Sequence, residues 1–498
     1  MTSAPGSSTE KGRSDSVWMD KVKDNQLIQH QPESSEDVET SDLPPQAAGK
    51  RSQLSDLFTI VSQALRRPVF GELFADNRGI QFCAGAALIS DGYQNNLMTM
   101  TNVLFKQEYA REYTSPVSTR VSNALLVGEA LARGIVGFGT GGEYPASSTS
   151  ASEAANEHHA TSKRRGPVFI LVTNLPLSLG GPFAVIVFLI VLSAAGKAHL
   201  STVWRVCFGI GCLFPLSVFY FRIKMMNSKL YRRSAIKRSV PYRLVLRYYW
   251  KSLLGTCGAW FLYDFVTFPN GVFSGTIISS VVSGGNTLLH TAEWQLLLGV
   301  LALPGVLLGA WACDRVGRKN VMMIGFGGYI IFGLIIGLAY DQITQITPLF
   351  VIFYGLMQSS GNFGPGNMLG LLSSEGYATS VRGTCYGISA AFGKAGAAVG
   401  TEAFTPIQES LGKKWTFIIA AICGLAGILV TWALVPNVTD EDLGKRDEMF
   451  RLYLVEHGWN GIMGEDDLKG LAEDVASVVV ADALPRPAVV GSEKVATQ

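Results

Sequence analysis

Long apolar segments alternate with short polar ones from about residue 79 to residue 435 of this chain. A helix needs about 20 mainly apolar residues to cross a bilayer, and ten segments are at least that long. They span approximately residues 79–105, 121–155, 167–193, 201–221, 253–283, 293–313, 320–340, 347–373, 382–406 and 415–435. The pattern predicts an all-α polytopic membrane protein with about 10 transmembrane helices.

The two ends of the chain follow a different pattern. Residues 1–76 are rich in Ser, Glu, Asp, Gln and Pro, which predicts a disordered tail. They hold no basic region followed by an apolar run, so no cleavable signal peptide is expected. Residues 437–498 are again polar and are expected to form a second tail with one short amphipathic helix near residue 449.

Basic residues fix the expected orientation. The link 222–251 holds ten Lys or Arg and no acid, and Lys163, Arg164 and Arg165 follow the second apolar segment. By the positive-inside rule both stretches are cytoplasmic, and both termini then are cytoplasmic as well. The link is also suited to contact anionic lipid headgroups; nucleic-acid binding is not expected of a basic run between two spans.

Composition excludes several classes of protein. The 498 residues are 48% hydrophobic and 16% charged, against about 25% charged for an ordinary soluble domain. The seven cysteines show no metal-ligand spacing, so neither a metal site nor a cofactor is expected. No nucleophile elbow or phosphate-binding glycine loop is present, and enzyme chemistry is therefore not expected.

Three charged residues lie deep within apolar segments. Asp91, Asp264 and Lys394 each follow the basic residue at the start of their segment by 12 or 13 positions, which is roughly 18–20 Å along a helix. This depth is near the middle of a bilayer, where a charge costs about 2.5–3.5 kcal/mol by insertion scales. Such residues usually face a cavity or one another, so we expect them to mark a transport pathway.

The stretch 133–153 combines charge with small residues. Arg133 and Glu143 lie among glycines and small hydroxyl residues that let another helix approach closely. Gly141, Gly142 and Pro145 loosen the backbone beside the acid, as in the broken helices of transporters.

Two motifs carry a family resemblance. Arg-x3-Gly-x-Gly from Arg133, followed by Gly-Gly-Glu-Tyr-Pro-x-Ser-x-Thr-x-x-Ser-Glu, resembles the fourth membrane helix of phosphate:proton symporters of the major facilitator superfamily, and within it the fungal glycerophosphoinositol permeases. Asp314-Arg315-Val-Gly317-Arg318-Lys resembles the loop signature of the same superfamily. The resemblance implies the major facilitator fold, with two helical bundles.

The resemblance also implies roles for individual residues. Lys394, Tyr144, Trp260, Asp264 and Asn367 correspond to substrate-binding positions, and Asp91, Glu143 and Asp264 to acids that carry the coupled proton. Arg133, Asp314, Arg315, Gly317 and Arg318 correspond to positions that gate or brace the helices.

Some family positions differ in this chain. Phe268 and Gly366 replace a tyrosine and an asparagine, and no glutamine matches near residues 174–176. These smaller or less polar groups predict a roomier cavity around the retained lysine. Such a cavity suits an organic phosphate diester better than inorganic phosphate, which stays open as the alternative substrate.

One region is too short for the implied fold. Between Arg120 and Glu153 lie 32 residues, or roughly 48 Å as a helix, which is too long for one crossing and too short for three. The family comparison implies that about 50 to 60 residues are absent near residues 130–133. The expected domains are then an incomplete bundle of about four spans at 77–221, the basic link 222–251 and a six-span bundle at 252–436.

The leading hypothesis is proton-coupled uptake of glycerophosphodiesters, such as glycerophosphoinositol, by a monomer in a fungal plasma membrane. Protonation of Asp264 or Asp91 from outside would permit anion binding near Lys394. Three alternatives stay open: an inorganic phosphate:proton symporter, a nutrient receptor that does not transport, and an inactive shortened variant.

Overall fold

The computed structural model describes residues 77–131, 148–149, 151–152, 165–196, 198–223, 236, 240–282, 287–438, 443–459, 461 and 463. Within these ranges the chain is almost entirely helical, and the single extended pairing is an isolated bridge between Ile236 and Met463. The predicted all-α fold is confirmed. The tail 1–76 and most of the stretch 133–153 lie outside the described residues.

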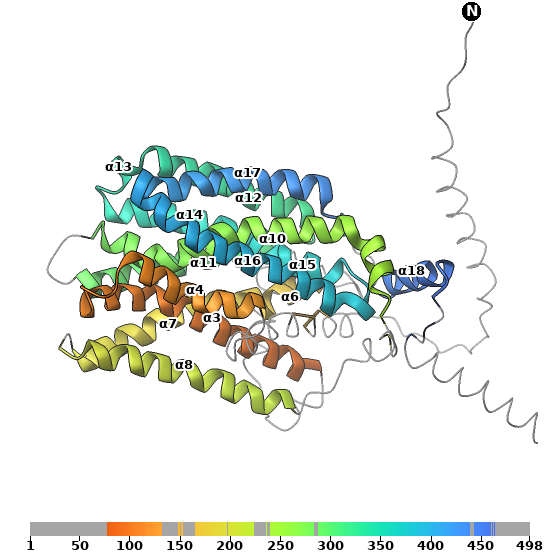
Figure 1. The fold of residues 1–498 in the computed structure, drawn as a ribbon, viewed down its shortest axis with the longest axis horizontal. Coiled ribbons are helices and arrows are strands. Elements are labelled where there is room, and N and C mark those ends of the chain that lie inside the picture. Colours follow the sequence, from red (N-terminus) through yellow and green to blue (C-terminus); the bar gives the residue numbers. More distant parts are fainter. Residues whose placement is uncertain are drawn as a thin grey trace, which may run out of the picture. The chain divides into compact units, whose positions relative to one another are not determined.

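Five described helices form the first half of the fold (Figure 1). They are α3 (Asn77–Glu108), α4 (Ser115–Leu131), α6 (Arg165–Val172), α7 (Asn174–Ala195) and α8 (Leu200–Ile223). Thr173 separates α6 from α7, and the two helices together form one continuous apolar stretch.

The second half begins after the basic link. Its elements are α10 (Tyr242–Ser279), α11 (Thr287–Ala312), α12 (Arg318–Leu338), α13 (Tyr340–Ile343), α14 (Thr347–Gly361), the π-helical turn η2 (Asn362–Gly366), α15 (Asn367–Glu375), α16 (Thr379–Leu411), α17 (Lys414–Leu434) and α18 (Leu443–Glu456). The predicted apolar segments coincide with these helices, apart from the part of 121–155 that lies outside the described residues.

Four of the described helical stretches are long and apolar enough to cross a membrane by length and composition: Arg165–Ala195, Thr287–Ala312, Arg318–Leu338 and Lys414–Leu434. Large apolar side chains on these and neighbouring helices face outward, including Leu338 and Trp432, which are 76% and 69% exposed. Outward apolar faces of this kind fit hydrocarbon better than water.

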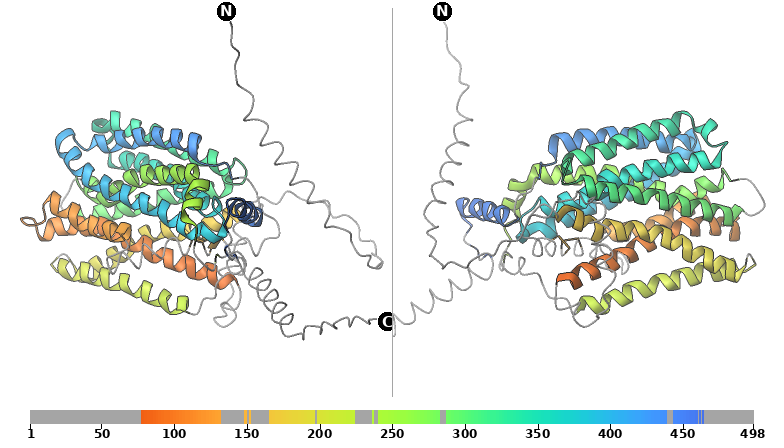
Figure 2. Two further views of the ribbon diagram at one scale, coloured as in Figure 1. Left: turned by 45° about the vertical axis from the view of Figure 1, so that its right-hand side comes forward. Right: turned by 180° about the vertical axis from the view of Figure 1, so that it is seen from behind.

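The long helices run alongside one another (Figures 1 and 2), with α10 packed against α16 and α17, and α3 packed against α7 and α8. We call the end at which α10, α12 and α16 begin the α18 end, because α18 lies there (Figure 1). The opposite end holds the start of α4 and the turn between α16 and α17.

Glycines set how closely these helices approach. A Cβ at Gly400 of α16 would collide with the carbonyl oxygen of Phe265 on α10, and one at Gly396 would lie 2.5 Å from that of Phe261. The same close contact joins α3 to α7 at Gly92 and Gly180. Small residues are the usual contact of helices in a bilayer, where close packing replaces the hydrophobic effect between helices.

Candidate functional site

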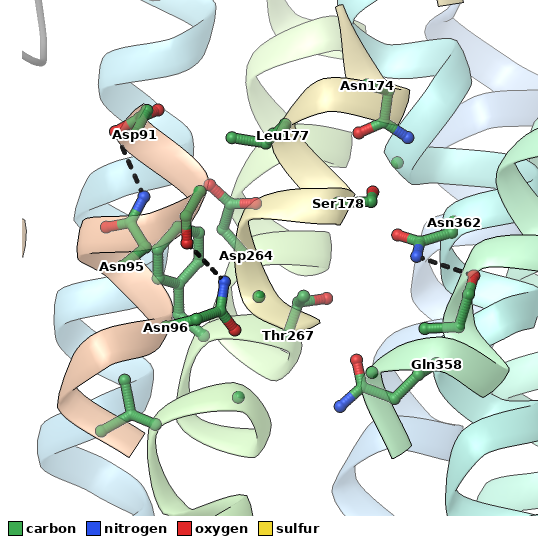
Figure 3. Close-up of a pocket in the computed structure, with 18 of the residues that line it drawn as sticks. Asp91, Asn95, Asn96, Asn174, Leu177, Ser178, Asp264, Thr267, Gln358 and Asn362 are labelled. Atoms are coloured by element: carbon green, nitrogen blue, oxygen red, sulfur yellow. Dashed lines mark hydrogen bonds between the residues drawn. The ribbon is translucent and has the colours of Figure 1, made fainter. Parts of the chain in front are cut away.

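A cavity of about 210 Å³ lies between the two halves of the fold (Figure 3). Side chains from α3, α7, α10, α11, α14, η2 and α16 line it. A single water needs only about 10–15 Å³ of the same kind of space, so the cavity has room for a small solute. Because these elements are spread over the chain, the cavity lies where segments far apart in the sequence meet.

The three charged residues singled out by depth all line this cavity. Asp91 comes from α3, Asp264 from α10 and Lys394 from α16. Both aspartates are buried, at 7% and 2% exposure. Among the described lining residues these three are the only ones with a charged side chain, so one cavity brings together a cation and two acids from three separate helices.

Lys394 is held against an aromatic ring. Its Nζ lies 4.1 Å from the centroid of Phe268, a cation–π contact that stabilises the ammonium away from bulk water. The residue before it, Gly393, is equally important, because a Cβ there would lie 2.8 Å from Oδ2 of Asp264 and 3.0 Å from Trp260. The missing side chain lets the acid and the indole of α10 approach α16 beside the lysine.

Asp91 lies where α3 crosses α7. Asn95, one turn further along α3, donates an amide hydrogen bond of 3.3 Å to Oδ1 of Asp91, and Figure 3 shows this pair at the edge of the cavity. Gly92 makes the crossing possible, because a Cβ there would collide with the carbonyl of Leu177. A backbone contact thus places this carboxylate in the cavity wall.

Trp260 also lines the cavity, as the resemblance implied. Its Nε1 donates to Oγ of Ser373 at 3.0 Å, and its ring packs edge-on against Tyr386 with 6.4 Å between centroids. The indole is therefore fixed in the cavity wall by contacts with α15 and α16.

The turn η2 adds an irregular backbone segment to the wall. A π-helical turn within a longer helix is frequent at functional sites, and here it carries the lining residues Asn362 and Gly366. A Cβ at Gly366 would lie 2.7 Å from the hydroxyl oxygen of Tyr263. The expectation that Gly366 leaves extra room is therefore wrong at this point, because Tyr263 fills the space.

Asn367 lies behind the cavity wall. It is 1% exposed and is absent from the lining; its Oδ1 accepts a 2.6 Å hydrogen bond from Asn174, and its Nδ2 donates to the carbonyl oxygen of Val306 at 3.0 Å. Asn174 on α7 is the residue of the pair that lines the cavity. The structure thus gives Asn367 contacts that position Asn174.

The loop signature forms a buried network at the α18 end. Nη2 of Arg318 lies 3.4 Å from Oδ1 of Asp314, and Nε of Arg318 lies 2.7 Å from Oε2 of Glu375. Oε1 of the same glutamate lies 2.6 Å from Nε of Arg165. Gly317 precedes α12 with φ of +90°. The network joins α6 of the first half to α12 and α15 of the second. Arg315 instead stacks on Trp311, 4.3 Å from its ring centroid.

Hydrogen bonds also join the halves at the opposite end. Thr119 on α4 pairs with Thr405 on α16 at 2.6 Å, and Asn123 donates to Glu402 at 2.7 Å. Thr99 on α3 donates to the carbonyl oxygen of Gly271 on α10 at 3.1 Å. The cavity therefore lies between two sets of contacts that connect the same two groups of helices.

Residues 114–450 match the family described as "Sugar (and other) transporter". The chain belongs to this family. It is accordingly a multi-pass membrane protein. Its fold agrees with that assignment: the structure of the proton:xylose symporter XylE, of the major facilitator superfamily, covers 76% of this chain and 99% of its own, with a TM-score of 0.55 and 15% identity. The predicted major facilitator fold is confirmed.

Closer relatives are similar over most of the chain. Glycerophosphoinositol permease 1 of Candida albicans is 51% identical, covering 89% of this chain and 95% of its own length. Glycerophosphoinositol transporter 1 of Saccharomyces cerevisiae is 52% identical over 77% of this chain and 84% of its own. A probable inorganic phosphate transporter of Arabidopsis thaliana is 26% identical over 62% of this chain and 70% of its own.

The relatives of this family member are also longer within the matched region. The alignment with the Candida protein is 498 positions long, whereas 89% of this chain is about 443 residues, so about 55 aligned positions are occupied in the relative alone. The alignment with the Saccharomyces protein has 435 positions for 77% of this chain, about 383 residues. Both differences are close to the 50 to 60 residues expected to be absent; their position near residues 130–133 stays a prediction.

Three predicted site residues of this transporter, Arg133, Glu143 and Tyr144, lie outside the described residues. Of the same stretch the structure describes residues 148–149 and 151–152, where Ser148 and Ser152 are almost fully buried. The roles of Arg133, Glu143 and Tyr144 remain predictions.

Sequence reasoning assigned no role to the neutral polar part of the lining. These residues are amides and hydroxyls within apolar helices: Asn95, Asn96, Asn174, Ser178, Thr267, Gln295, Gln358 and Asn362. Depth arguments rank residues by the cost of a charge, so neutral amides did not stand out. The available signal was the occurrence of Asn and Gln near the middle of apolar segments.

Proposed function

We propose that this chain is a secondary active transporter that couples uptake of glycerophosphodiesters, such as glycerophosphoinositol, to protons. The observation that carries the proposal is the meeting of Lys394, Asp264 and Asp91 in one cavity between the two halves. The names and similarity of the Candida and Saccharomyces relatives support the substrate class.

The charges of the cavity support proton coupling. With both aspartates ionised, the described lining carries one positive and two negative charges, and an incoming phosphodiester adds one more negative charge. Buried like charges destabilise one another, and a carboxylate close to an anion binds a proton more readily. Protonation of both acids would leave the lysine and the phosphodiester as a neutral pair, so proton and anion travel together.

The contacts at the two ends support alternating access. In the proposed cycle Asp91 and Asp264 take up protons from the outside, the anion binds at Lys394, and the halves rock to open the α18 end. The network of Asp314, Arg318, Glu375 and Arg165 would hold that end closed until then. Glu143 and Tyr144 are proposed to complete the proton route and the substrate contacts.

The orientation follows from the basic segments. We place the α18 end and both termini in the cytoplasm, by the positive-inside rule, in a fungal plasma membrane. The link 222–251 is proposed to contact anionic lipid. The chain is proposed to act as a monomer, because the cavity is assembled from helices of one chain.

Inorganic phosphate is the second candidate substrate. The similarity to plant inorganic phosphate transporters favours it, as does Lys394 in the cavity, which suits phosphate as a compact cation. Competition distinguishes the two substrates. If inorganic phosphate is the cargo, an excess of unlabelled phosphate would inhibit uptake of labelled phosphate, and glycerophosphocholine would not.

The deciding experiment measures uptake of labelled glycerophosphoinositol by cells that lack their own permeases and express the full chain. We expect accumulation that falls as external pH rises and is abolished by a protonophore. Lys394→Gln should reduce uptake at least about a hundredfold, because a buried anion then lacks its partner charge. Lys414→Gln, which removes an exposed lysine at the start of α17, is the matched control and should transport normally.

Other results of the same experiment would replace the proposal. Dependence on sodium instead of protons would overturn the coupling. Specific binding at the cell surface without accumulation would favour a nutrient receptor. Absence of both binding and accumulation would identify an inactive shortened variant.

A further inference from the structure

The cavity has a second wall whose described polar residues are amides without charge. Gln295 on α11, Gln358 on α14 and Asn362 on η2 line it. Figure 3 shows Gln358 and Asn362 across the cavity from Asp91 and Asn95. The described lining thus has an ionic side on α3, α10 and α16, where Asn95 and Asn96 accompany the charges, and an amide side on α11, α14 and η2.

The amide side is built by close packing of α11 and α14. A Cβ at Gly305 of α11 would collide with the carbonyl of Ser359, and one at Gly355 of α14 would lie 2.7 Å from Cβ of Leu301. These contacts hold the end of α14, with Gln358, and the start of η2, with Asn362, against α11. Asn362 follows Gln358 by four positions, so both project from the same face of the helix.

The amides retain hydrogen-bonding capacity toward the cavity. Gln295 is 8% exposed, and its buried Oε1 has no hydrogen-bond partner in the described part of the chain. Asn362 donates its Nδ2 to the carbonyl oxygen of Ala302 at 3.1 Å, which leaves its oxygen on the cavity side (Figure 3). Because buried polar atoms are normally paired, an amide oxygen without a partner on a residue that lines a solute cavity points to a ligand that donates a hydrogen bond.

We propose that Gln295, Gln358 and Asn362 form a subsite for a hydroxyl-rich head group, and that this subsite makes the transporter prefer an inositol diester over a choline diester. The inference rests on the proposed function, in which the phosphate lies at Lys394. A hydroxyl both donates and accepts, and so does an amide. Neutral amides therefore match several ring hydroxyls and add no charge beside the phosphodiester.

A choline head group fits this cavity less well. A quaternary ammonium has no N–H or O–H to offer Gln295, and proteins bind it with the faces of aromatic rings. The face of Phe268 is already in contact with the ammonium of Lys394, and Trp260 is engaged by Ser373 and Tyr386. Choline would leave the amide oxygen unpaired and would compete with the ammonium of Lys394 for the face of Phe268.

Competition for uptake tests the proposal in cells expressing the full chain. Labelled glycerophosphoinositol is offered with unlabelled glycerophosphoinositol or glycerophosphocholine, and the ratio of their half-inhibitory concentrations measures selectivity. We expect the unaltered chain to favour the inositol diester at least about tenfold, and Gln295→Leu or Gln358→Leu to reduce that ratio about tenfold, the value of one lost hydrogen bond to a buried group. Gln408→Leu is the control, because Gln408 pairs with Thr416 at 3.0 Å and does not line the cavity.

Selectivity separates a binding role from a structural one. A variant that is only misfolded lowers surface amount and uptake without changing the ratio, so an unchanged ratio in both Gln295→Leu and Gln358→Leu overturns the subsite. A preference of the unaltered chain for the choline diester overturns it as well. If the unaltered chain accumulates neither diester, the proposed function has failed, and the subsite with it; accumulation with an unchanged ratio refutes the subsite alone.

Discussion

Lys394 shows how one half-buried charge is accommodated by its immediate neighbours. An isolated ammonium deep in a membrane is unfavourable by a few kcal/mol, yet here the ring of Phe268 and the acid-bearing helix α10 surround it. Gly393 allows this arrangement, since any side chain there would meet Asp264 and Trp260. At the scale of the residue, the absence of a Cβ is as important as the charge beside it.

Gly393→Ala should impair transport at unchanged surface amount. The added methyl would lie 2.8 Å from Oδ2 of Asp264, so the carboxylate must move away from α16, and we expect uptake of labelled glycerophosphoinositol to fall at least about tenfold. Gly387→Ala in the same helix is the control, because no atom of the described residues lies within 4 Å of the new methyl; alanine there should be neutral or stabilise the helix by about 0.5–1 kcal/mol. Equal uptake by both variants would contradict the role of Gly393.

At the scale of the element, α18 completes the start of α16. Ala378 at the N-cap of α16 offers no side-chain acceptor, and the backbone N–H of Thr379 is instead paired by Oδ1 of Asp447 on α18 at 2.6 Å. Arg446 donates to the carbonyl oxygen of Gly376 at 3.0 Å. Apolar contacts add to these bonds, because Phe450 and neighbouring residues of α18 are buried against α10 and α16.

Asp447→Ala should therefore destabilise the α18 end. Loss of a capping carboxylate costs about 0.5–2 kcal/mol, and the charge also complements the positive end of the helix dipole. We expect a lower melting temperature for the full chain purified in detergent. Glu448→Ala, which removes an exposed neighbouring acid, should leave the melting temperature unchanged; a similar fall in both variants would argue against a specific cap.

At the scale of the whole molecule, the two halves are unequal. The second half supplies α10, α11, α14, η2 and α16 to the cavity, whereas α3 and α7 are the described helices of the first half that line it. About 55 positions of the Candida relative have no counterpart in this chain. If these form the second and third crossings, one wall of the cavity is incomplete.

Inserting the corresponding segment of the Candida permease between residues 132 and 133 tests this account. We expect the extended chain to reach the cell surface in greater amount and to transport glycerophosphoinositol faster per surface molecule, because two further helices would close the cavity. Removing two crossings preserves the orientation of all later helices, so the epitope accessibility of the two termini should be the same with and without the insert. Unchanged uptake per molecule would indicate that the shorter chain is already complete.

Much of the fold and part of the site could be predicted from the sequence. Runs of apolar residues gave the helices, because a helix in a bilayer must satisfy its backbone internally over a fixed length. The depth of Asp91, Asp264 and Lys394 followed from the constant rise per residue. The motifs gave the family, which the comparisons confirmed.

The tertiary structure decided what depth along a helix cannot express, which is the direction each side chain faces. Rotation about a helix axis depends on which residues permit close contact with neighbours, and here glycines such as Gly92, Gly305 and Gly393 set it. That packing brings Lys394 to the cavity, leaves Asn367 behind the wall and assembles an amide side from three separate elements. The sequence by itself determined which residues are costly to bury, and only the packed helices determined which of them meet.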